Sequence, residues 1–330
     1  MKVLVTGGSG FLGHHLVKTI LDNTDWYITI IDRASNRFGL KRLEELGILN
    51  NERVTLIRSD FATLDFASTL IDARSFNFIF HLGAKTSVNE SSVIPDAYLH
   101  SNVIGTQKVL EFACRQNRLN SFIYVSTNEI FGLGVRGKAF AEWSPYNSQS
   151  VYAATKAAGE EISMAYSVQR GLPVLVIHTM NVFGERETPE KFIPQIIKHV
   201  LNEKTIPLYY QEKFGIGGRT YLDVRSFSNA ILFLSRGIID GRLQFQGEKV
   251  NIAGEVYITN DQLIAKVSQL IGKPYKTELV DYYDKHPGHI LDSALDISKL
   301  LSLGWRSESS FDDGLERTVS WWLSNQSWPM

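Results

Sequence analysis

Runs of β-branched and other apolar residues alternate along the first half of the chain with segments of helical periodicity. The apolar runs predict strands at residues 2–7, 27–32, 54–60, 76–84, 121–127 and 173–184. Apolar positions three and four residues apart predict helices at residues 11–23, 97–117 and 149–169. Apolar strands separated by helices are typical of a parallel sheet that is buried on both faces and connected by right-handed crossovers. The pattern therefore predicts an α/β fold with a doubly wound parallel sheet.

The alternation becomes irregular after about residue 184. Prolines recur there, and two loops follow, the glycine-rich FGIGGR at 214–219 and YYDKHPGHILD at 282–292. Glycine and proline at this density interrupt regular elements. We therefore expect a smaller mixed C-terminal lobe, closed by a packing helix at residues 311–326.

The composition is that of an ordinary globular protein. The 330 residues include 34 Lys and Arg against 35 Asp and Glu, so the net charge of −1 gives no reason to expect nucleic acid or an acidic membrane as partner. Cys114 is the single cysteine, and no CxxC or HExxH spacing predicts a metal site. No signal-peptide pattern opens the chain, and no apolar run reaches the ~18 residues of a membrane span. We expect a cytoplasmic protein.

The segment TGGSGFLG, residues 6–13, links the first predicted strand directly to the first predicted helix. Gly7, Gly10 and Gly13 match a variant of the fingerprint with which a βαβ unit binds a dinucleotide, because glycines allow a tight turn and a close approach to the pyrophosphate. The diphosphate would lie at the helix N-terminus, where Phe11 and Leu12 stand and where free N–H groups favour negative charge. The sequence therefore predicts a dinucleotide site.

Asp32 ends the second predicted strand, about 20 residues after the glycine-rich loop, where it can accept hydrogen bonds from the adenosine ribose. A carboxylate at this place repels a 2′-phosphate and so favours NAD over NADP. Arg33 and Arg37 leave NADP open, because a nearby arginine can accommodate that phosphate. The predicted cofactor is NAD.

Two further predicted strands end in residues that we assign to the same site. Asp60 and Phe61 follow the third strand, where the adenine should lie, and Leu82, Gly83 and Ala84 follow the fourth. In such sheets ligands bind at the carboxyl ends of the strands.

The segment SVYAATKAAGEE carries Tyr152 and Lys156 four residues apart, on one face of a predicted helix. A phenol with a pKa of about 10 is a poor base, but an ammonium group about one turn away favours the phenolate and lowers that pKa. Thr127 stands at the end of the preceding strand. We predict that Thr127 orients a substrate alcohol, Tyr152 takes its proton, and Lys156 tunes Tyr152 and contacts the nicotinamide ribose.

These motifs, in this order, resemble those of the extended short-chain dehydrogenase/reductase superfamily. The likeness continues through HLGAKTSVNES at 81–91, VSTNEIFG at 125–132, NVFGERETPEKFIPQII at 181–197 and GGRTYLDV at 217–224. Within the superfamily, the chain is similar to the NAD-dependent nucleotide-sugar epimerases and dehydratases, and most similar to the dTDP-glucose 4,6-dehydratases.

The resemblance implies two lobes and a nucleoside diphosphate sugar as substrate. Residues 1–180 with about 221–254 would form the NAD-binding Rossmann domain, and about 181–220 with 255–330 the nucleotide-sugar-binding lobe. It adds three cofactor contacts: Ser35, Ser101 and Val182. Besides Thr127, the substrate contacts that it implies are Thr86, Ser87, Asn181, Lys191, Phe192, Pro207, Tyr209, Arg219, Asn251, His286 and His289. A homodimer built on the helices around residues 94–117 and 150–169 is also implied.

Glu129, two residues after Thr127, matches the general base of the 4,6-dehydratases. Oxidation of the C4 hydroxyl to a ketone makes the C5 hydrogen acidic, so that a carboxylate can remove it. Loss of the C6 hydroxyl as water then gives an enone to which hydride can return. The resemblance therefore implies dehydration through a 4-keto intermediate.

Asn128 departs from that family, whose members carry an aspartic acid there to protonate the departing hydroxyl. An amide can hydrogen-bond this hydroxyl but cannot deliver a proton, and losing a general acid costs about 10²–10⁴-fold in rate. Three explanations stay open: Glu129 acting twice, a histidine or a water supplies the proton, the reaction differs after C4 oxidation, or the elimination is slow. The pair Thr86-Ser87 also departs, since it replaces a Ser-His pair and partly resembles the loop of UDP-galactose 4-epimerases.

Dehydration is the first hypothesis, and others stay open. Epimerisation beside the ketone, 5,6-dehydration and decarboxylation of a sugar uronate all proceed from the same 4-keto intermediate. A non-catalytic NAD or nucleotide sensor is the alternative from another class. Such a protein would have no need to keep Thr127, Tyr152 and Lys156 together.

Overall fold

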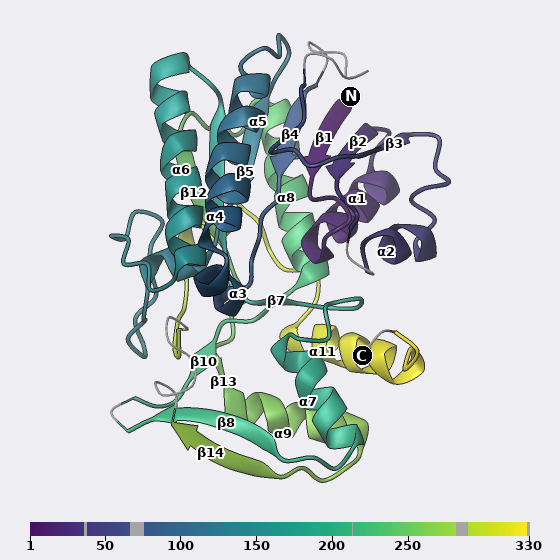
Figure 1. Cartoon of the computed structure of the whole chain (residues 1–330), viewed down its shortest axis with the longest axis vertical. Helices are drawn as coiled ribbons and strands as arrows, with labels where there is room; N and C mark the ends of the chain where they lie inside the picture. Colours follow the sequence, from purple (N-terminus) through teal and green to yellow (C-terminus); the bar gives the residue numbers. More distant parts are fainter. Residues whose placement is uncertain (36–37, 67–75, 213, 282–289, 329–330) are drawn as a thin grey trace.

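A sheet of seven strands forms the centre of the molecule (Figure 1). The computed structural model describes residues 1–35, 38–66, 76–212, 214–281 and 290–328. The strands of this sheet are β1 (Lys2–Thr6), β2 (Tyr27–Asp32), β3 (Val54–Arg58), β4 (Phe78–His81), β5 (Ser121–Val125), β6 (Val174–Thr179) and β12 (Glu248–Ile252). Their order is β12-β6-β5-β4-β1-β2-β3, and every neighbouring pair is parallel.

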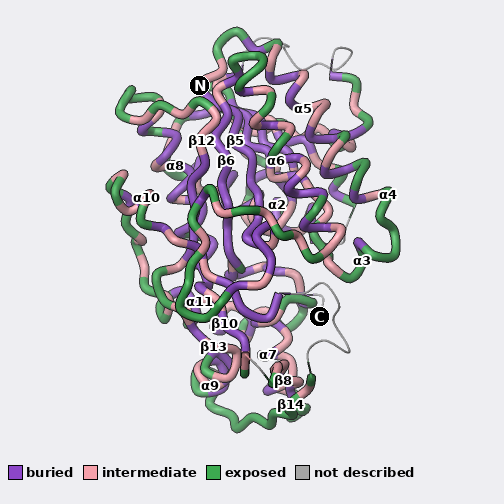
Figure 2. Tube along the Cα trace, turned by 90° about the vertical axis from the view of Figure 1, so that its left-hand side faces the viewer, coloured by how far each residue is buried: buried purple, intermediate pink, exposed green. Residues whose placement is uncertain are grey.

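Helices cover both faces of this sheet. The helices of this larger lobe are α1 (Phe11–Asn23), α2 (Gly39–Glu45), α3 (Val88–Val93), α4 (Pro95–Tyr98), the π-helix η1 (Leu99–Ile104), α5 (Gly105–Ala113), the 3-10 turn η2 (Asn128–Phe131), α6 (Val151–Arg170), α8 (Val224–Ile239) and α10 (Ser298–Ser302). On β1, Val3 and Val5 pack with α1 and α8, whereas Leu4 packs with α5. Because neighbouring side chains of a strand point to opposite faces, apolar residues at every position bury both. The central strands β4, β5 and β6 are accordingly buried along their length (Figure 2), whereas the edge strand β3 is only partly buried. The predicted doubly wound fold is confirmed.

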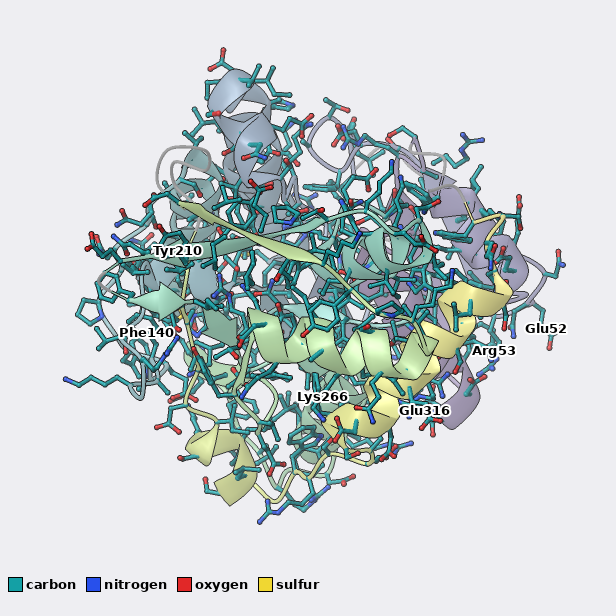
Figure 3. The ribbon with its side chains drawn as sticks, turned by 90° about the horizontal axis from the view of Figure 1, so that it is seen from below. Glu52, Arg53, Phe140, Tyr210, Lys266 and Glu316 are labelled. Carbon is teal, nitrogen blue, oxygen red and sulfur yellow. The ribbon has the colours of Figure 1, made fainter. Side chains whose placement is uncertain are left out.

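A smaller mixed lobe lies below this sheet in Figure 1. Its strands are β7 (Val182–Phe183), β8 (Ile206–Gln211), β9 (Gly215–Ile216), β10 (Gly218–Arg219), β11 (Leu222–Asp223), β13 (Ile258–Thr259) and β14 (Thr277–Asp281), and its helices are α7 (Phe192–Leu201), α9 (Asn260–Ile271) and α11 (Phe311–Ser324). Seen from below, α9 with Lys266 lies beside α11 with Glu316 (Figure 3). Lys266 is 2.8 Å from Asp312, and Leu263 and Trp322 are buried between these helices.

Some elements differ from their predicted extent. The helix predicted at 97–117 is divided into α4, η1 and α5, and the strand predicted at 173–184 ends at Thr179 before the short β7. β12 belongs to the large sheet, as expected for residues 221–254, which were assigned to the NAD-binding domain. Leu300 and Trp305 were assigned to the smaller lobe, but they are buried against the large sheet. The domain boundaries therefore stay a prediction. Among the described residues, no helix has the length and apolar character that crossing a bilayer requires.

Candidate active site

A cavity of about 390 Å³ lies at the carboxyl ends of β1, β4, β5 and β6. Strand order reverses between β1 and β4, which is where doubly wound sheets bind their ligands. The volume suits a small-molecule site. The predicted residues that line it are Gly7, Gly10, Phe11, Leu12, Gly13, Asp32, Arg33, Ser35, Phe61, Leu82, Gly83, Ala84, Thr86, Ser101, Thr127, Asn128, Glu129, Tyr152, Lys156, Asn181, Val182 and Lys191.

The glycine-rich loop between β1 and α1 has no room for larger residues at two positions. Gly7 has a φ of +72°, which residues with a side chain rarely adopt. A Cβ at Gly13 would lie 2.1 Å from the carbonyl oxygen of Gly7. Gly10 caps α1 without a side-chain hydrogen bond, so the first N–H groups of the helix remain available to an anion. The loop therefore fits the diphosphate of a dinucleotide.

Asp32 connects the end of β2 to this loop. Its Oδ2 accepts a hydrogen bond from the backbone N–H of Ser9 at 3.0 Å, and its Oδ1 accepts one from Ala34 at 2.7 Å. A carboxylate oxygen can accept more than one hydrogen bond, so Asp32 can still bind a ribose hydroxyl. Arg33 beside it is exposed and lies 3.6 Å from Asp60.

Thr127, at the end of β5, and Tyr152, in the first turn of α6, meet at the inner end of the cavity. Both side chains are buried, and their hydroxyl groups are hydrogen-bonded to each other. Burial raises the pKa of Tyr152 and the charge of Glu129 raises it further, while the hydrogen bond from Thr127 opposes both effects. One substrate hydroxyl can contact both residues.

Lys156 follows Tyr152 by one turn of α6. Its Nζ donates to the carbonyl oxygen of Val125 at 2.7 Å and lies 4.1 Å from the centre of the Tyr124 ring. Burial lowers the pKa of Lys156 to about 7, and the charge of Glu160 opposes this. The pKa of Tyr152 is nevertheless raised in this structure, because burial and the charge of Glu129 prevail, and the tuning of Tyr152 by Lys156 stays a prediction.

Asn128 and Glu129 form the η2 turn, which Thr127 caps by accepting a hydrogen bond from the Glu129 N–H at 3.3 Å. The Oε2 of Glu129 is shielded from solvent and has no hydrogen-bond partner within the described part of the chain. Burial raises the pKa of Glu129, and the charges of Arg219 and Lys191 oppose this. Asn128 is buried and donates through Nδ2 to the hydroxyl of Ser293 at 3.2 Å. The turn thus presents an unpartnered carboxylate beside a bonded amide.

Residues 3–253 match the model of the NAD dependent epimerase/dehydratase family. The chain belongs to this family. It is 31% identical to a dTDP-glucose 4,6-dehydratase of Haemophilus influenzae over 99% of each chain, and 32% identical to a probable dTDP-glucose 4,6-dehydratase of Sinorhizobium fredii over 99% of this chain and 94% of the relative.

Solved structures of this epimerase/dehydratase family have the same fold. The dTDP-glucose 4,6-dehydratase DesIV of Streptomyces venezuelae, with NAD bound, has a TM-score of 0.87 at 28% identity and covers 99% of this chain and 98% of its own. The UDP-glucuronic acid 4-epimerase of Bacillus cereus, in complex with UDP-glucuronic acid and NAD, has a TM-score of 0.86 at 25% identity and covers 98% and 99%. The predictions of the family, of an enzyme acting on nucleotide sugars and of NAD as cofactor are confirmed.

Behind the active site of this epimerase/dehydratase lies a buried network centred on Glu160, one turn beyond Lys156 on α6. Glu160 accepts hydrogen bonds from Ser126 at 2.7 Å, from His178 at 2.9 Å and from Tyr146, and lies 2.9 Å from the ammonium group of Lys249. Burial alone would raise the pKa of Glu160, but these partners hold it at about 2. The cluster therefore keeps a negative charge close to Lys156.

Some predicted residues do not line the cavity. Among the described residues these are Asp60, Ser87, Phe192, Pro207, Tyr209, Arg219 and Asn251. Arg219 donates to the carbonyl oxygens of Gly218, Leu291 and Ile290, yet its charge acts on Glu129. Arg37, His286 and His289 lie outside the described residues. The binding roles of the predicted residues, within the cavity and outside it, stay predictions except for Asn251.

Asn251 requires a correction. It is fully buried in β12, where its amide donates to the carbonyl oxygens of Phe140 and Asp296 and its Oδ1 lies 2.8 Å from His178. A substrate contact would break these buried bonds. The structure therefore places Asn251 in the support of the site and not in the site.

Several lining residues were missed by the sequence reasoning: Ser9, Arg42, Val125, Ser126, Thr179, Met180, Glu187 and Thr188. Ser9 lies in the glycine-rich segment 6–13 and Ser126 in the segment 125–132, so both could have been predicted from the neighbouring residues of these motifs. Arg42 and Glu187 come from α2 and from the segment after β7, and nothing in the sequence connects these two regions. Only the fold brings them together.

Proposed function

We propose that the enzyme is a 4,6-dehydratase that converts a dTDP-hexose into its 4-keto-6-deoxy form. Relatives of matching length named dTDP-glucose 4,6-dehydratase support this substrate. The observation that carries the proposal is the carboxylate of Glu129, which lines the cavity beside Thr127 and Tyr152 with an unpartnered Oε2. A 4-epimerase only removes and returns hydrogen at C4, so it needs no second base here.

In the first step, Thr127 holds the C4 hydroxyl and Tyr152 takes its proton. Bound NAD would accept hydride from C4 and later return it to C6. The raised pKa of Tyr152 opposes its ionisation. Lys156, one turn away on the same helix, is the cation that favours the phenolate as the proton leaves the substrate.

In the second step, Glu129 removes the C5 hydrogen, which the C4 ketone has made acidic. A raised pKa makes its carboxylate a stronger base than an exposed glutamate. Its Oε2 gives up no hydrogen bond when it takes the proton.

In the third step, Glu129 passes the proton from C5 to the C6 hydroxyl, which leaves as water. Asn128 holds the departing hydroxyl through an amide N–H, for which it exchanges its bond to Ser293. Tyr152 and Glu129 take up two protons, and two are needed, one for the water and one for C5 when the enone is reduced. The sugar thus loses one water, with no net oxidation.

The second candidate function is epimerisation through the same 4-ketone. Asn128 favours it, because a buried amide bonded to Ser293 cannot serve as a general acid. In this reaction C5 would stay untouched, or Glu129 would remove its proton and an acid on the opposite face would return one, and the C6 hydroxyl would stay.

The experiment is incubation of the full-length enzyme with dTDP-, UDP-, GDP- and CDP-sugars, followed by mass spectrometry and NMR. Loss of one water from a dTDP-hexose supports the proposal. An unchanged mass with a new sugar spectrum would replace it by epimerisation, and loss of carbon dioxide from a uronate by decarboxylation. No turnover with any sugar would favour the sensor alternative.

We also propose that the enzyme is a homodimer in the cytoplasm. The apolar side chains of Val93, Ile94, Leu99 and Ile104 are exposed on α3, η1 and the residues between them, next to α6. Such a patch is typical of a protein-protein contact. The single unpaired Cys114 fits a reducing compartment.

A further inference from the structure

Arg42, on α2, is one of the most deeply buried charged side chains of the described protein, with 1% of its surface exposed. Its Nε donates to the carbonyl oxygen of Arg186 at 2.9 Å, and its Nη1 lies 3.5 Å from the carbonyl oxygen of Ser9. Ser9 belongs to the glycine-rich loop, and Arg186 follows β7. Arg42 therefore joins three segments at the wall of the cavity, which it lines.

The third nitrogen of this guanidinium, Nη2, is shielded from solvent and has no hydrogen-bond partner among the residues that the structure describes. A buried charged donor without a partner is costly, and native proteins rarely tolerate one unless a ligand satisfies it. The ring of Phe38, 5.5 Å away, offers only its π face. The free nitrogen therefore indicates a ligand with an oxygen acceptor.

The surrounding charges leave the guanidinium positive. Burial lowers the pKa of Arg42 to about 10, and Glu187, Asp32 and Glu190 oppose this, so the group is protonated at neutral pH. None of these carboxylates forms an ion pair with Arg42 in the part of the chain that the structure describes. An anionic ligand would therefore find this charge unneutralised.

Glu187, which lines the same cavity, does not cancel the charge either. Burial raises the pKa of Glu187 to about 8, against the opposing charges of Lys191 and Arg42. Its carboxyl group is thus mostly neutral at pH 7. The phenol of Tyr221 is the other titratable group that faces it.

We propose that Arg42 is a cofactor-binding residue whose Nη2 donates to the diphosphate of the bound dinucleotide. The bond from its Nη1 to the carbonyl oxygen of Ser9 holds the guanidinium group at the loop that would receive the diphosphate. Because guanidinium and phosphate form charge-assisted bonds, this contact adds affinity that the loop alone does not supply. The inference concerns the cofactor and holds whichever sugar reaction follows.

The test compares ligands that differ in the diphosphate. ADP, adenosine, NADP and dTDP are titrated by NMR into full-length protein freed of bound dinucleotide, as wild type, Arg42→Gln, Arg42→Lys and Lys41→Gln. We expect Arg42→Gln to weaken the binding of ADP about 10- to 100-fold and the binding of adenosine less than about threefold. Arg42→Lys keeps the charge and should retain part of the preference for ADP. Lys41→Gln removes a more exposed charge of the same helix and should change neither.

Three outcomes would overturn the inference. Equal weakening of ADP and adenosine by Arg42→Gln would mean that Arg42 only supports the fold. A loss confined to NADP would assign Arg42 to a 2′-phosphate, and a loss of dTDP binding with ADP unchanged would assign it to the substrate. None depends on turnover, so each is distinct from a failure of the proposed reaction.

Glu187 gives a second readout. Above pH 8 its carboxylate would oppose an anion at Arg42, so the affinity of the wild type for ADP should fall between pH 7 and 9. Glu187→Gln should reduce this fall, while Lys156, Lys191 and Tyr221 stay in place in both proteins. A smaller fall in Glu187→Gln than in the wild type would support the inference, because it places the anion beside this carboxyl group and Arg42.

Discussion

Asn128 and Glu129 are neighbours in one turn, and their surroundings give them different chemistry. The amide of Asn128 is occupied by Ser293, while Oε2 of Glu129 has no partner. Burial raises the pKa of Glu129 although Arg219 and Lys191 attract its negative form. At the scale of single residues, Glu129 can therefore act as a base, whereas Asn128 cannot act as an acid.

Glu129→Gln should abolish dehydration, with a loss in kcat of about 10²–10⁴-fold, because an amide cannot take the C5 proton. NAD binding should persist, since the substitution leaves the glycine-rich loop and Asp32 unchanged. In the wild-type enzyme the pKa of Glu129 is raised. We therefore expect the acid-side decrease of kcat at a higher pH than a glutamate with an ordinary pKa would give.

The measurement is kcat from pH 5 to 9, with deuterium exchange at C5 in heavy water. Retained exchange in the Glu129→Gln variant would assign the base to another group.

Asn128→Asp should speed dehydration about tenfold or more, because burial and the nearby Glu129 both keep the introduced carboxyl protonated and able to donate. The readout is the rate of water loss under single-turnover conditions. Asn128→Ala is the matched control and should be slower than wild type. A rate that falls or stays equal in Asn128→Asp would favour the epimerase alternative.

The α6 helix presents Tyr152, Lys156 and Glu160 at four-residue intervals, so all three lie on one face. The first two line the cavity, and Glu160 lies behind them with Lys249 and His178. A single helix thus carries a proton acceptor, a cation and the buried anion that supports the cation. Its N-cap Ser150 accepts a hydrogen bond from Ala153 and fixes the first turn where Tyr152 stands.

Glu160→Gln should destabilise the fold by about 3–5 kcal/mol, because it leaves Lys249 charged and buried without its partner. Glu161→Gln, at the neighbouring exposed position, is the control and should change stability by less than about 0.5 kcal/mol. Chemical denaturation measures both. Equal stability of the two variants would mean that the buried ion pair contributes nothing.

The pH dependence follows from the same shift. Because the folded pKa of Glu160, about 2, lies below its ordinary value, its contribution is present at neutral pH and is lost as the pH falls from about 4.5 towards 2. Glu160→Gln should remove this part of the acid denaturation.

At the scale of the whole molecule, η1 and α6 pack together and leave apolar side chains on their outer side. Leu99 and Ile104 of η1 are 48% and 46% exposed. This surface lies on the large lobe, away from the smaller sheet of β8, β9 and β14 (Figure 1). It is the face that the proposed dimer would bury.

Leu99→Asp combined with Ile104→Asp should convert the dimer into a monomer, because charges are costly in an apolar contact. Light scattering after gel filtration gives the mass. Leu279→Asp, an exposed apolar position on β14, is the control and should remain dimeric. A monomeric wild type would refute the dimer, and a dimeric double variant would move its contact elsewhere.

The sequence by itself determined three features: the parallel sheet, the alternation of strands and helices along the chain, and the positions where polar residues follow strands. These features rest on local rules: apolar runs define buried strands, glycine allows the turn at Gly7, and a spacing of four places Tyr152 beside Lys156. The dinucleotide fingerprint and the family could also be recognised from the sequence, because both rest on short local motifs.

Only the tertiary structure decided what each polar group touches. It buried Asn251 among carbonyl oxygens, bonded Asn128 to Ser293, and brought Arg42 to Ser9 across 33 positions of the chain. It also set the direction of pKa shifts, raising that of Tyr152 where the spacing alone suggested a decrease. Burial and charge act through space, so their effects depend on neighbours that the order of residues does not reveal.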